Sequence, residues 1–466
     1  MRKLAKVALW AGIVTLVAGG AYLYTTWNRR LIPSGSVRID PQARIDPSRS
    51  YQIVVWVPEA PLPWDRGAHR GAVSEAAEQF ARVFPNIEIR VEFLPWHEGH
   101  ARLREALALG QPPDVYAMPQ GARKVSDELQ VPAGPYLSEE SRADHLPRAL
   151  ELVHLDGYEW AWPTWIRPHV WVARADLHQE LAQSIPAWTA AHLEPLLARI
   201  RQESGVRGLA LNPFDPSLFM DVMARSTGRN LIGPDGERAW SVEEMEAALA
   251  FFASMIERGL TWPNAEAMSR ARLAHFWNRQ AALVAPVNPW LLRHLLVRGG
   301  ALNAGDTAPE SARRQAAVVP PPAVGDESGS YPATVGGFVL FRQREYKGDD
   351  HTKAAAMVAE HLARRLGPWE AAQLLAVPAH PTTWDAWRAD AALPEPVYDL
   401  FVLWASRAVA PPVHDDHAHQ QQKAAERVIA AQFPRLWQGD APRQIAEAIA
   451  LHVDGLRAEV PAASIP

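Results

Sequence analysis

Histidine clusters are the first residues that could do chemistry here, because imidazole nitrogens bind zinc. His414, His417 and His419 lie close together with two aspartates among them, so a metal site is one interpretation. The other is a solvated helix start, where acidic residues face the positive end of the helix dipole. His97 and His100 are one residue too close for the H-E-x-x-H zinc helix, so we interpret them as a helix start. We predict no metal and no cofactor.

Carboxylates are the second candidates, because a glycoside-cleaving enzyme needs two of them flanking the bond. Glu59, Asp65 and Asp215 are available, but no local signature selects a pair. Ser328 lies one position away from a nucleophile elbow, and neither glycine-rich phosphate motif occurs. Cysteine is absent, which excludes a cysteine nucleophile, thiolate zinc sites and disulfides. We predict that the protein is not an enzyme, with glycoside cleavage kept as an alternative.

Tryptophan is the third candidate, and its chemistry is recognition rather than catalysis. The sequence contains 19 tryptophans, most of which we expect to serve packing. An indole offers a flat apolar face on which the C–H face of a sugar stacks, while nearby carboxylates and amides bind its hydroxyls. Carbohydrate is therefore the ligand class that we expect.

Composition narrows the class of protein. The chain has 466 residues, of which 48% are hydrophobic and 21% are charged, as in a soluble globular protein with more than one core. A formal net charge of -5 gives no basic surface for phosphates, so we predict no nucleic-acid partner.

The N-terminus carries a membrane signal. Arg2, Lys3 and Lys6 precede an uncharged run over residues 7–24, about the length that crosses a bilayer as a helix. We predict that residues 1–27 are a signal peptide or membrane anchor helix, and favour an uncleaved anchor. Residues 28–50 would be a solvated linker, and the rest of the chain would lie outside the cytoplasm, in the periplasm or on the outer face of the membrane.

The elements that would position a site begin with a βαβαβ pattern. Hydrophobic periodicity predicts strands at 51–57, 87–93 and 114–118, with helices at 71–84 and 98–109 between them. Such units form parallel sheets with right-handed crossovers, and ligands bind beyond the carboxyl ends of their strands. The loops at those ends contain Glu59, Trp64, Asp65, Trp96 and Gln120. These could contact a ligand, although Trp64 and Trp96 could instead cover the sheet edge.

A later helix and strand lead to another candidate residue. We predict that Phe276, Ala281 and Ala282 pack beneath a helix end, followed by a short strand at 283–285. Pro289 cannot continue a strand, so Trp290 would begin a loop at a cleft. Earlier in the chain, a capping box at Ser241 predicts the start of a structural helix.

Several motifs together resemble one family, the extracellular solute-binding proteins of family 1, which are maltose-binding-type receptors of ABC sugar importers. The F-x-x-G-x-A-A-M-x-x-x-G-P-W segment corresponds to 276–290, with Arg279 and Asn288 in place of glycines. An F-x-x-x-x-P-x-I-x-V element begins at Phe80, and a G-x-P-P-D-V turn begins at Gly110, whose Asp114 we interpret as structural. A crossing segment corresponds to 155–177.

The resemblance implies an α/β, two-lobed periplasmic-binding-protein fold of type II, with a hinge of about three crossing segments after the N-terminal membrane helix. Lobe 1 would comprise 51–162 plus 332–378, and lobe 2 would comprise 163–331 plus 379–466. It also implies further ligand-binding residues: Trp162, Trp165 and Arg167 at the cleft floor, Trp290, Trp384, and Gly336 and Gly337 by their backbone. We also expect a cleft-facing helix within 212–227 to carry Asp215 and Asp221, with Asp215 as a ligand contact.

The resemblance further implies a role. We expect an extracytoplasmic substrate-binding component of an ABC transporter, a monomer that binds a mono- or oligosaccharide between its lobes and delivers it to permease subunits. A membrane-tethered sugar sensor is an alternative, in which the partner would be a signalling protein.

Overall fold

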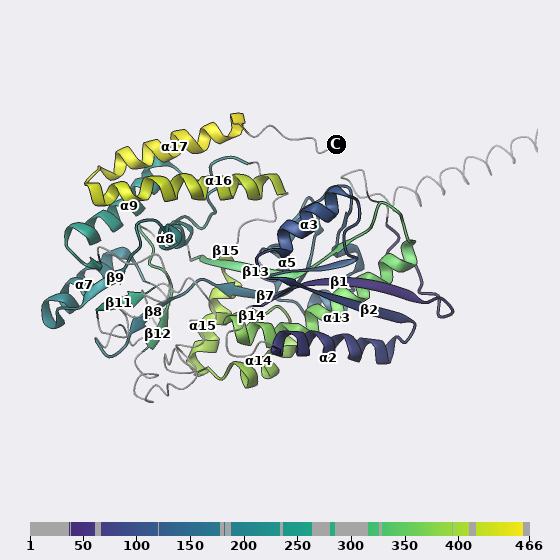
Figure 1. Ribbon diagram of the computed structural model, residues 1–466. Helices are drawn as coiled ribbons and strands as arrows, with labels where there is room; N and C mark the ends of the chain where they lie inside the picture. Colours follow the sequence, from purple (N-terminus) through teal and green to yellow (C-terminus); the bar gives the residue numbers. More distant parts are fainter. Residues whose placement is uncertain are drawn as a thin grey trace, which may run out of the picture.

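The protein has two α/β lobes, each built around its own sheet (Figure 1). The computed structural model describes residues 37, 39–60, 67–119, 121–177, 181, 188–233, 236–262, 280–284, 316–325, 329–393, 395–409 and 416–459. Across those residues no helix is long and apolar enough to cross a membrane. The predicted membrane helix at 1–27 lies outside them.

The larger sheet contains the predicted βαβαβ unit. Strand β1 (Tyr51–Glu59) pairs in parallel with β2 (Ile87–Pro95) and with β3 (Val115–Met118), which confirms the prediction. Helices α2 (Ala68–Val83) and α3 (Gly99–Ala108) connect them and lie on opposite sides of the sheet (Figure 1). The face of β1 that carries Trp56 is only partly buried, and the Arg102 guanidinium lies over the Trp56 ring there.

Strand β13 (Tyr331–Phe341) joins the parallel unit to the rest of the larger sheet. It runs antiparallel to β3 on one side and to β7 (Trp162–Pro168) on the other. Strands β4 (Gln130–Val131) and β15 (Ala408–Val409) also pair with β13, and β14 (Val377–Pro378) pairs with β7. Helix α13 (Asp349–Leu374) packs along this sheet beside α2. Smaller elements are β5 (His154–Leu155), β6 (Tyr158–Glu159), α4 (Glu139–Ala143), α5 (Pro147–Glu151), α14 (Trp384–Ala391) and α15 (Glu395–Ser406).

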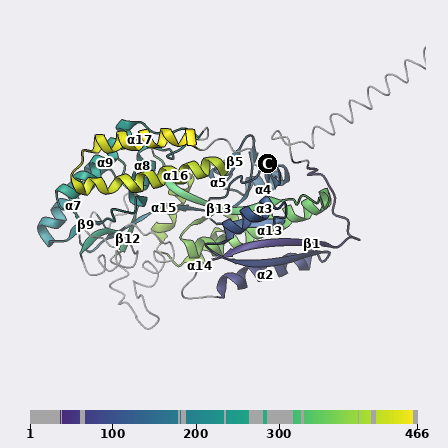
Figure 2. The ribbon, with the colours of Figure 1, turned by 45° about the horizontal axis from the view of Figure 1, so that its top comes forward.

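The smaller sheet forms the second lobe. Its strands, in spatial order, are β10 (Thr261–Trp262), β9 (Arg207–Ala210), β11 (Ala281–Val284), β8 (Trp171–Arg174) and β12 (Ala316–Val319). Its helices are α7 (Ala190–Ser204), α8 (Ser217–Thr227), α9 (Val242–Glu257), α16 (Asp416–Gln432) and α17 (Pro442–Glu459). Figure 2 shows α16 and α17 side by side above this lobe. The predicted capping box of α9 is confirmed by reciprocal hydrogen bonds between Ser241 and Glu244.

Strand pairing and core packing place two lobe boundaries at other residues than we predicted. We placed the first change of lobe after residue 162, but β7 remains in the larger sheet to Pro168. We placed another after residue 378, but α14 and α15 contribute Trp387 and Phe401 to the core of the first lobe. The chain therefore crosses between Pro168 and Trp171 and again between β12 and β13.

Asp114 is a structural residue, as the sequence predicted. Its buried carboxylate accepts hydrogen bonds from the Val54 amide at 2.9 Å and from Gln343 Nε2 at 2.8 Å, and it contacts Lys347 and His351. Burial alone would raise the pKa of this carboxyl, but the hydrogen bonds from His351 and Val54 hold it below its usual value. Asp114 thereby ties β1 to the start of α13.

Two glycines allow β13 to lie close to β7. A Cβ at Gly336 would fall on the Trp165 ring, and one at Gly337 would meet the Trp162 carbonyl oxygen at 2.6 Å. The register between the strands also shifts between these glycines. We predicted that Gly336 and Gly337 contact the ligand by their backbone. The structure shows that both make room for the indoles and backbone of β7.

Replacing Gly336 with alanine should destabilise the protein, because the added methyl overlaps the Trp165 ring. We expect the free energy of unfolding to fall by about 1–3 kcal/mol, measured by urea denaturation. Gly71→Ala is the matched control, because Gly71 lies in α2 with nothing within 4 Å of its Cβ position. It should raise stability by up to about 1 kcal/mol. Equal stability of Gly336→Ala and the parent would contradict this account.

A pair of buried histidines lies beside the larger sheet. The ring centroids of His145 and His380 are 4.2 Å apart, and Nδ1 of His145 lies 2.6 Å from the Ser141 carbonyl oxygen. Burial, together with the neighbouring His145, lowers the pKa of His380 to about 3. Burial also lowers the pKa of His145. Both rings are therefore neutral in the folded protein at pH values where an unfolded histidine takes up a proton.

Stability should consequently fall as the pH drops below about 6.5, because the unfolded chain binds protons that the folded chain excludes. His380 alone should contribute a loss of about 1.4 kcal/mol per pH unit. The window from about pH 6.5 to 4.5 isolates histidines, since Asp114 and other carboxylates with lowered pKa values lose stability only below their unfolded values. Urea midpoints across this window measure the slope. The double variant His145→Gln, His380→Gln should reduce the slope, while His361, whose pKa burial also lowers, keeps a share of it. An unchanged slope would rule this origin out.

Candidate functional site

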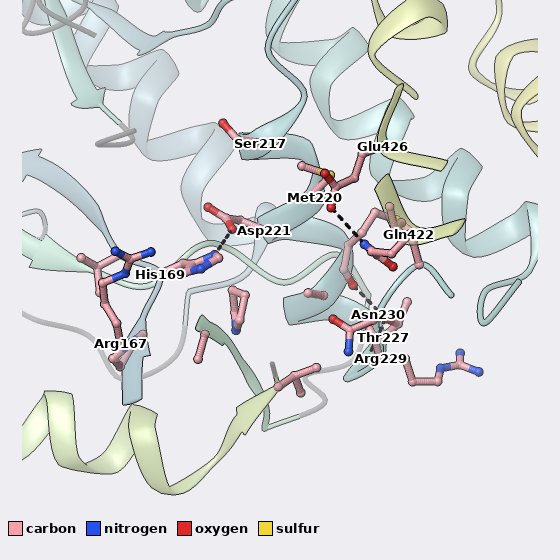
Figure 3. Close-up of a pocket in the computed structure, with 18 of the residues that line it drawn as sticks. Arg167, His169, Ser217, Met220, Asp221, Thr227, Arg229, Asn230, Gln422 and Glu426 are labelled. Carbon is pink, nitrogen blue, oxygen red and sulfur yellow. Dashed lines mark hydrogen bonds and ion pairs between the residues drawn. The ribbon is translucent and has the colours of Figure 1, made fainter. Parts of the chain in front are cut away.

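A cavity of about 240 Å³ lies where the two lobes meet. Its walls come from the end of β7 and the crossing after it, from the start of β13, and from α8 and α16 (Figure 3). Both lobes therefore contribute side chains to a single space. A ligand that fills it would contact the two lobes together.

His169, in the first crossing, connects the lobes at the cavity wall. Its Nδ1 lies 2.7 Å from Asp221 Oδ1 on α8 (Figure 3). Its Nε2 lies 3.0 Å from Thr334 Oγ1 on β13. A carboxylate only accepts hydrogen bonds, so Nδ1 donates to Asp221. In the neutral ring Nε2 then accepts from the threonine hydroxyl. This chain of bonds fixes the angle of the ring against the cavity.

Arg167 lies two residues before His169 and also lines the cavity. Its Nη2 is 3.5 Å from Thr334 Oγ1, which is at the limit of a hydrogen bond. Burial lowers the pKa of the guanidinium to about 10, although the charge of Asp221 acts in the opposite direction. The group is therefore still a cation at neutral pH.

The remaining walls combine hydroxyls and amides with apolar side chains. The polar lining residues are Ser217, Thr227, Asn230 and Gln422, and the apolar ones include Met220, Met223, Leu231, Trp240 and Leu374. Glu426 also lines the cavity and pairs with Lys423 at 2.8 Å. Such a lining can hydrogen-bond to several hydroxyls of a polar ligand while packing against its carbon skeleton.

A smaller cavity of about 20 Å³ lies at the carboxyl ends of β1 and β3. Trp165 and Trp96 line it, and Trp165 Nε1 donates to Glu370 Oε2 at 2.9 Å. His69 is buried there, stacked on Trp369, with its Nε2 3.6 Å from Glu370 Oε1. The Ala60 amide donates to His69 Nδ1 at 2.9 Å, so the neutral ring carries its hydrogen on Nε2. A space of this size holds about one water molecule.

Trp162, also predicted at the cleft floor, lies away from both cavities. Its indole has no exposed surface and belongs to the core that includes α2 and α13. Trp165 is also buried, at 1% exposure, but reaches the smaller cavity. The two indoles belong to different cores, as expected for residues three positions apart in a strand, whose side chains point to opposite faces.

Three other predicted residues are used locally. Glu59 accepts two hydrogen bonds from Arg70, at 2.8 and 2.7 Å, which keep its pKa low. Asp215 accepts from the Ser217 amide in the turn before α8, beside Phe214, whose side chain is 74% exposed. Trp384 Nε1 donates to the Pro378 carbonyl at 3.1 Å. None of the three lines the larger cavity.

The other predicted ligand contacts, Trp64, Asp65, Gln120 and Trp290, lie outside the described residues. So does His414, and of the histidine cluster only the surroundings of the His419 side chain are described. Within the described ranges, no three histidine, cysteine or acidic side chains form a group that could hold a metal ion.

Sequence reasoning missed several cavity residues. It placed Asp221 on a cleft-facing helix without assigning it a role, and it did not select His169, Ser217, Gln422 or Glu426. A signal existed for His169, since it continues the alternation of Trp165 and Arg167. The sequence gives no such signal for the α16 residues Gln422 and Glu426, because their approach to α8 depends on how helices far apart in the chain pack.

The structure was compared with known proteins. No family model matches the chain, and no curated protein matches its sequence. Solved structures do match. The sugar-binding protein MalE from Xanthomonas citri superposes with a TM-score of 0.70 and 18% identity, covering 88% of this chain and 98% of that one.

Two further solved structures have a similar fold. The GacH receptor of Streptomyces glaucescens, solved unliganded and with acarbose, gives a TM-score of 0.64 at 18% identity, covering 88% of this chain and 100% of that one. The ABC substrate-binding protein Lmo0181 from Listeria monocytogenes, solved with cycloalternan, gives 0.63 at 14%, covering 88% and 99%. The protein therefore has the two-lobed α/β fold of the maltose- and oligosaccharide-binding periplasmic proteins.

Proposed function

We propose that this protein is the extracytoplasmic substrate-binding component of an ABC transporter and that it binds a carbohydrate between its lobes. The observation that carries the proposal is the cavity of about 240 Å³ lined by side chains from both lobes and from the crossing between them. Ligand binding at a junction of two lobes can change the angle between them, whereas binding within one lobe cannot.

The mechanism follows from differential contacts. A ligand that touches only one lobe in the open form and both lobes in the closed form stabilises closure by its additional contacts. His169 contacts α8 and β13 together, so it would register the relative position of the lobes. Permease subunits would then recognise the closed form. No bond of the ligand is broken.

Carbohydrate is supported by the chemistry of the walls. Hydroxyl and amide groups of Ser217, Thr227, Asn230 and Gln422 can bind sugar hydroxyls, while methionine and leucine side chains cover the carbon skeleton. The structural neighbours were solved with acarbose and with cycloalternan, which agrees with this class. We retain Trp64, Asp65, Gln120 and Trp290 as predicted contacts.

The proposal includes a location and partners. The N-terminal segment at 1–27 would anchor the protein to the membrane, with the lobes in the periplasm or on the outer face. The protein would act as a monomer and would contact permease subunits. In the alternative role of a tethered sensor, it would instead contact a signalling protein, and crosslinking in cells distinguishes the two.

Glycoside cleavage is less well supported. Two of the acids considered from sequence have local partners, Glu59 with Arg70 and Asp215 with the Ser217 amide. Neither lines the interlobe cavity, where two carboxyl groups would have to flank the bond of a bound sugar. Release of product from any glycan on incubation with the protein would revive this alternative.

A saccharide panel tests the proposal by thermal unfolding. A specific sugar at a hundredfold excess over its dissociation constant should stabilise the protein by about 2.7 kcal/mol, seen as a rise in the unfolding midpoint. Asp221→Asn should reduce that rise, because His169 loses the charge that orients it. Trp290→Ala should reduce it as well if the predicted stacking occurs.

Asp399→Asn is the control for the charge change, since Asp399 is 82% exposed on α15, away from the cavity lining. It should leave the midpoint shift intact. A panel in which no mono- or oligosaccharide shifts the midpoint would remove carbohydrate as the ligand class and leave only the fold.

A further inference from the structure

Most, but not all, of the charged side chains that line the interlobe cavity form an ion pair. Five titratable side chains line it in the described part of the chain: Arg167, His169, Asp221, Arg229 and Glu426. His169 pairs with Asp221 at 2.7 Å, Glu426 with Lys423 at 2.8 Å, and Arg229 with Glu244. Arg167 has no ion pair with any described residue.

The hydrogen-bonding capacity of Arg167 is also largely unused. A guanidinium presents five N–H donors in a planar fork, and the one hydrogen bond to a described residue is the 3.5 Å contact with Thr334 Oγ1. That hydroxyl is also 3.0 Å from His169 Nε2, and the nearby Asp221 carboxylate accepts from His169. The neighbours of Arg167 are thus bound mainly to one another.

Arg167 is only partly exposed, and this partial burial makes the arrangement costly without a partner. A cation removed from water loses hydration free energy, which only an anion or several acceptors restore. The lowered pKa of Arg167 reflects that loss. A side chain of this kind on a ligand-sized cavity is suited to an anionic group brought in by the ligand.

We propose, on the basis of the proposed function, that the ligand is an acidic saccharide and that Arg167 binds its carboxylate. The planar fork of the guanidinium matches a carboxylate with two parallel hydrogen bonds. A phosphate dianion would call for a second unpaired cation, and the other basic residues on the described cavity wall, His169 and Arg229, already have acidic partners. Uronic acids carry one carboxylate beside hydroxyls that the remaining wall can bind.

Matched sugar pairs test this assignment by isothermal titration calorimetry on the full chain. The acids are galacturonic acid, glucuronic acid and their short oligomers, and the neutral partners are galactose, glucose and the corresponding oligomers, which differ only at C6. Wild-type protein should bind at least one acid about 10- to 100-fold more tightly than its neutral partner, as expected for a charged hydrogen-bonded contact. Added salt should weaken the acid more than the neutral sugar.

Arg167→Gln should abolish the difference within a pair by weakening the acid while leaving the neutral sugar bound. Arg167→Lys keeps the charge without the fork, so it should restore part of the preference. Arg82→Gln is the matched control, because Arg82 lies on α2 with a side chain that is 75% exposed, and it should change nothing.

The outcomes separate this proposal from the proposed function. Neutral sugars bound as tightly as their acids, or a preference that survives Arg167→Gln, would overturn the acidic ligand while carbohydrate binding stands. Tighter binding of galactose 6-phosphate or glucose 6-phosphate than of the uronic acids would overturn the carboxylate assignment. Failure of every saccharide to bind would overturn both proposals together.

Discussion

The packing of β7 against β13 is the constraint on which the rest of the structure depends. An indole can lie over Gly336 because that residue has no Cβ, and the register of the two strands shifts between Gly336 and Gly337. Strand β13 also pairs with β3, β4 and β15, so this contact holds the parallel unit to the hinge side of the sheet. Because β7 continues directly into the first crossing, the position of Trp165 sets where Arg167 and His169 emerge at the cavity.

The lobes are connected by side chains as well as by backbone. His169 joins α8 of the second lobe to β13 of the first. On the same helix, Arg225 is fully buried, donates to the Ser330 carbonyl at 2.9 Å and lies 4.2 Å from the Tyr331 ring centroid. Helix α8 is thus tied to both described crossings. The interlobe cavity adjoins these contacts, so a ligand bound there can influence the angle between the lobes.

Local patterns in the sequence predicted local structure well. The βαβαβ unit, the α9 capping box and the structural role of Asp114 follow from periodicity, capping chemistry and turn residues within short windows. The lobe boundaries at 162 and 378 did not follow in this way. Whether β7 joins the larger or the smaller sheet depends on its pairing with β13, far along the chain.

In the candidate site, too, features that depend on local sequence were predicted and features that depend on long-range packing were not. Arg167 and Trp165 were predicted beside cavities because strand ends can be found from sequence, and both line one. Strand alternation places Trp162 and Trp165 on opposite faces of β7, but which face adjoins a cavity depends on the helices that pack on each side, which the sequence does not show. The pairing of charges could not be predicted either, because Lys423, Glu244 and Asp221 come from separate elements. That pairing leaves Arg167 without an acidic partner among the described residues.

The buried Arg225 fixes one end of α8, about which the helix can rotate. Its guanidinium fixes the carboxyl-terminal end of the helix to the crossing before β13, whereas Ser217 at the other end faces the cavity. The two positions are about 12 Å apart along the axis at 1.5 Å per residue. A turn of about ten degrees around the fixed end therefore displaces the cavity wall by about 2 Å, most of a hydrogen-bond length. Small rotations near the pivot would thus decide whether the polar wall can reach a bound molecule.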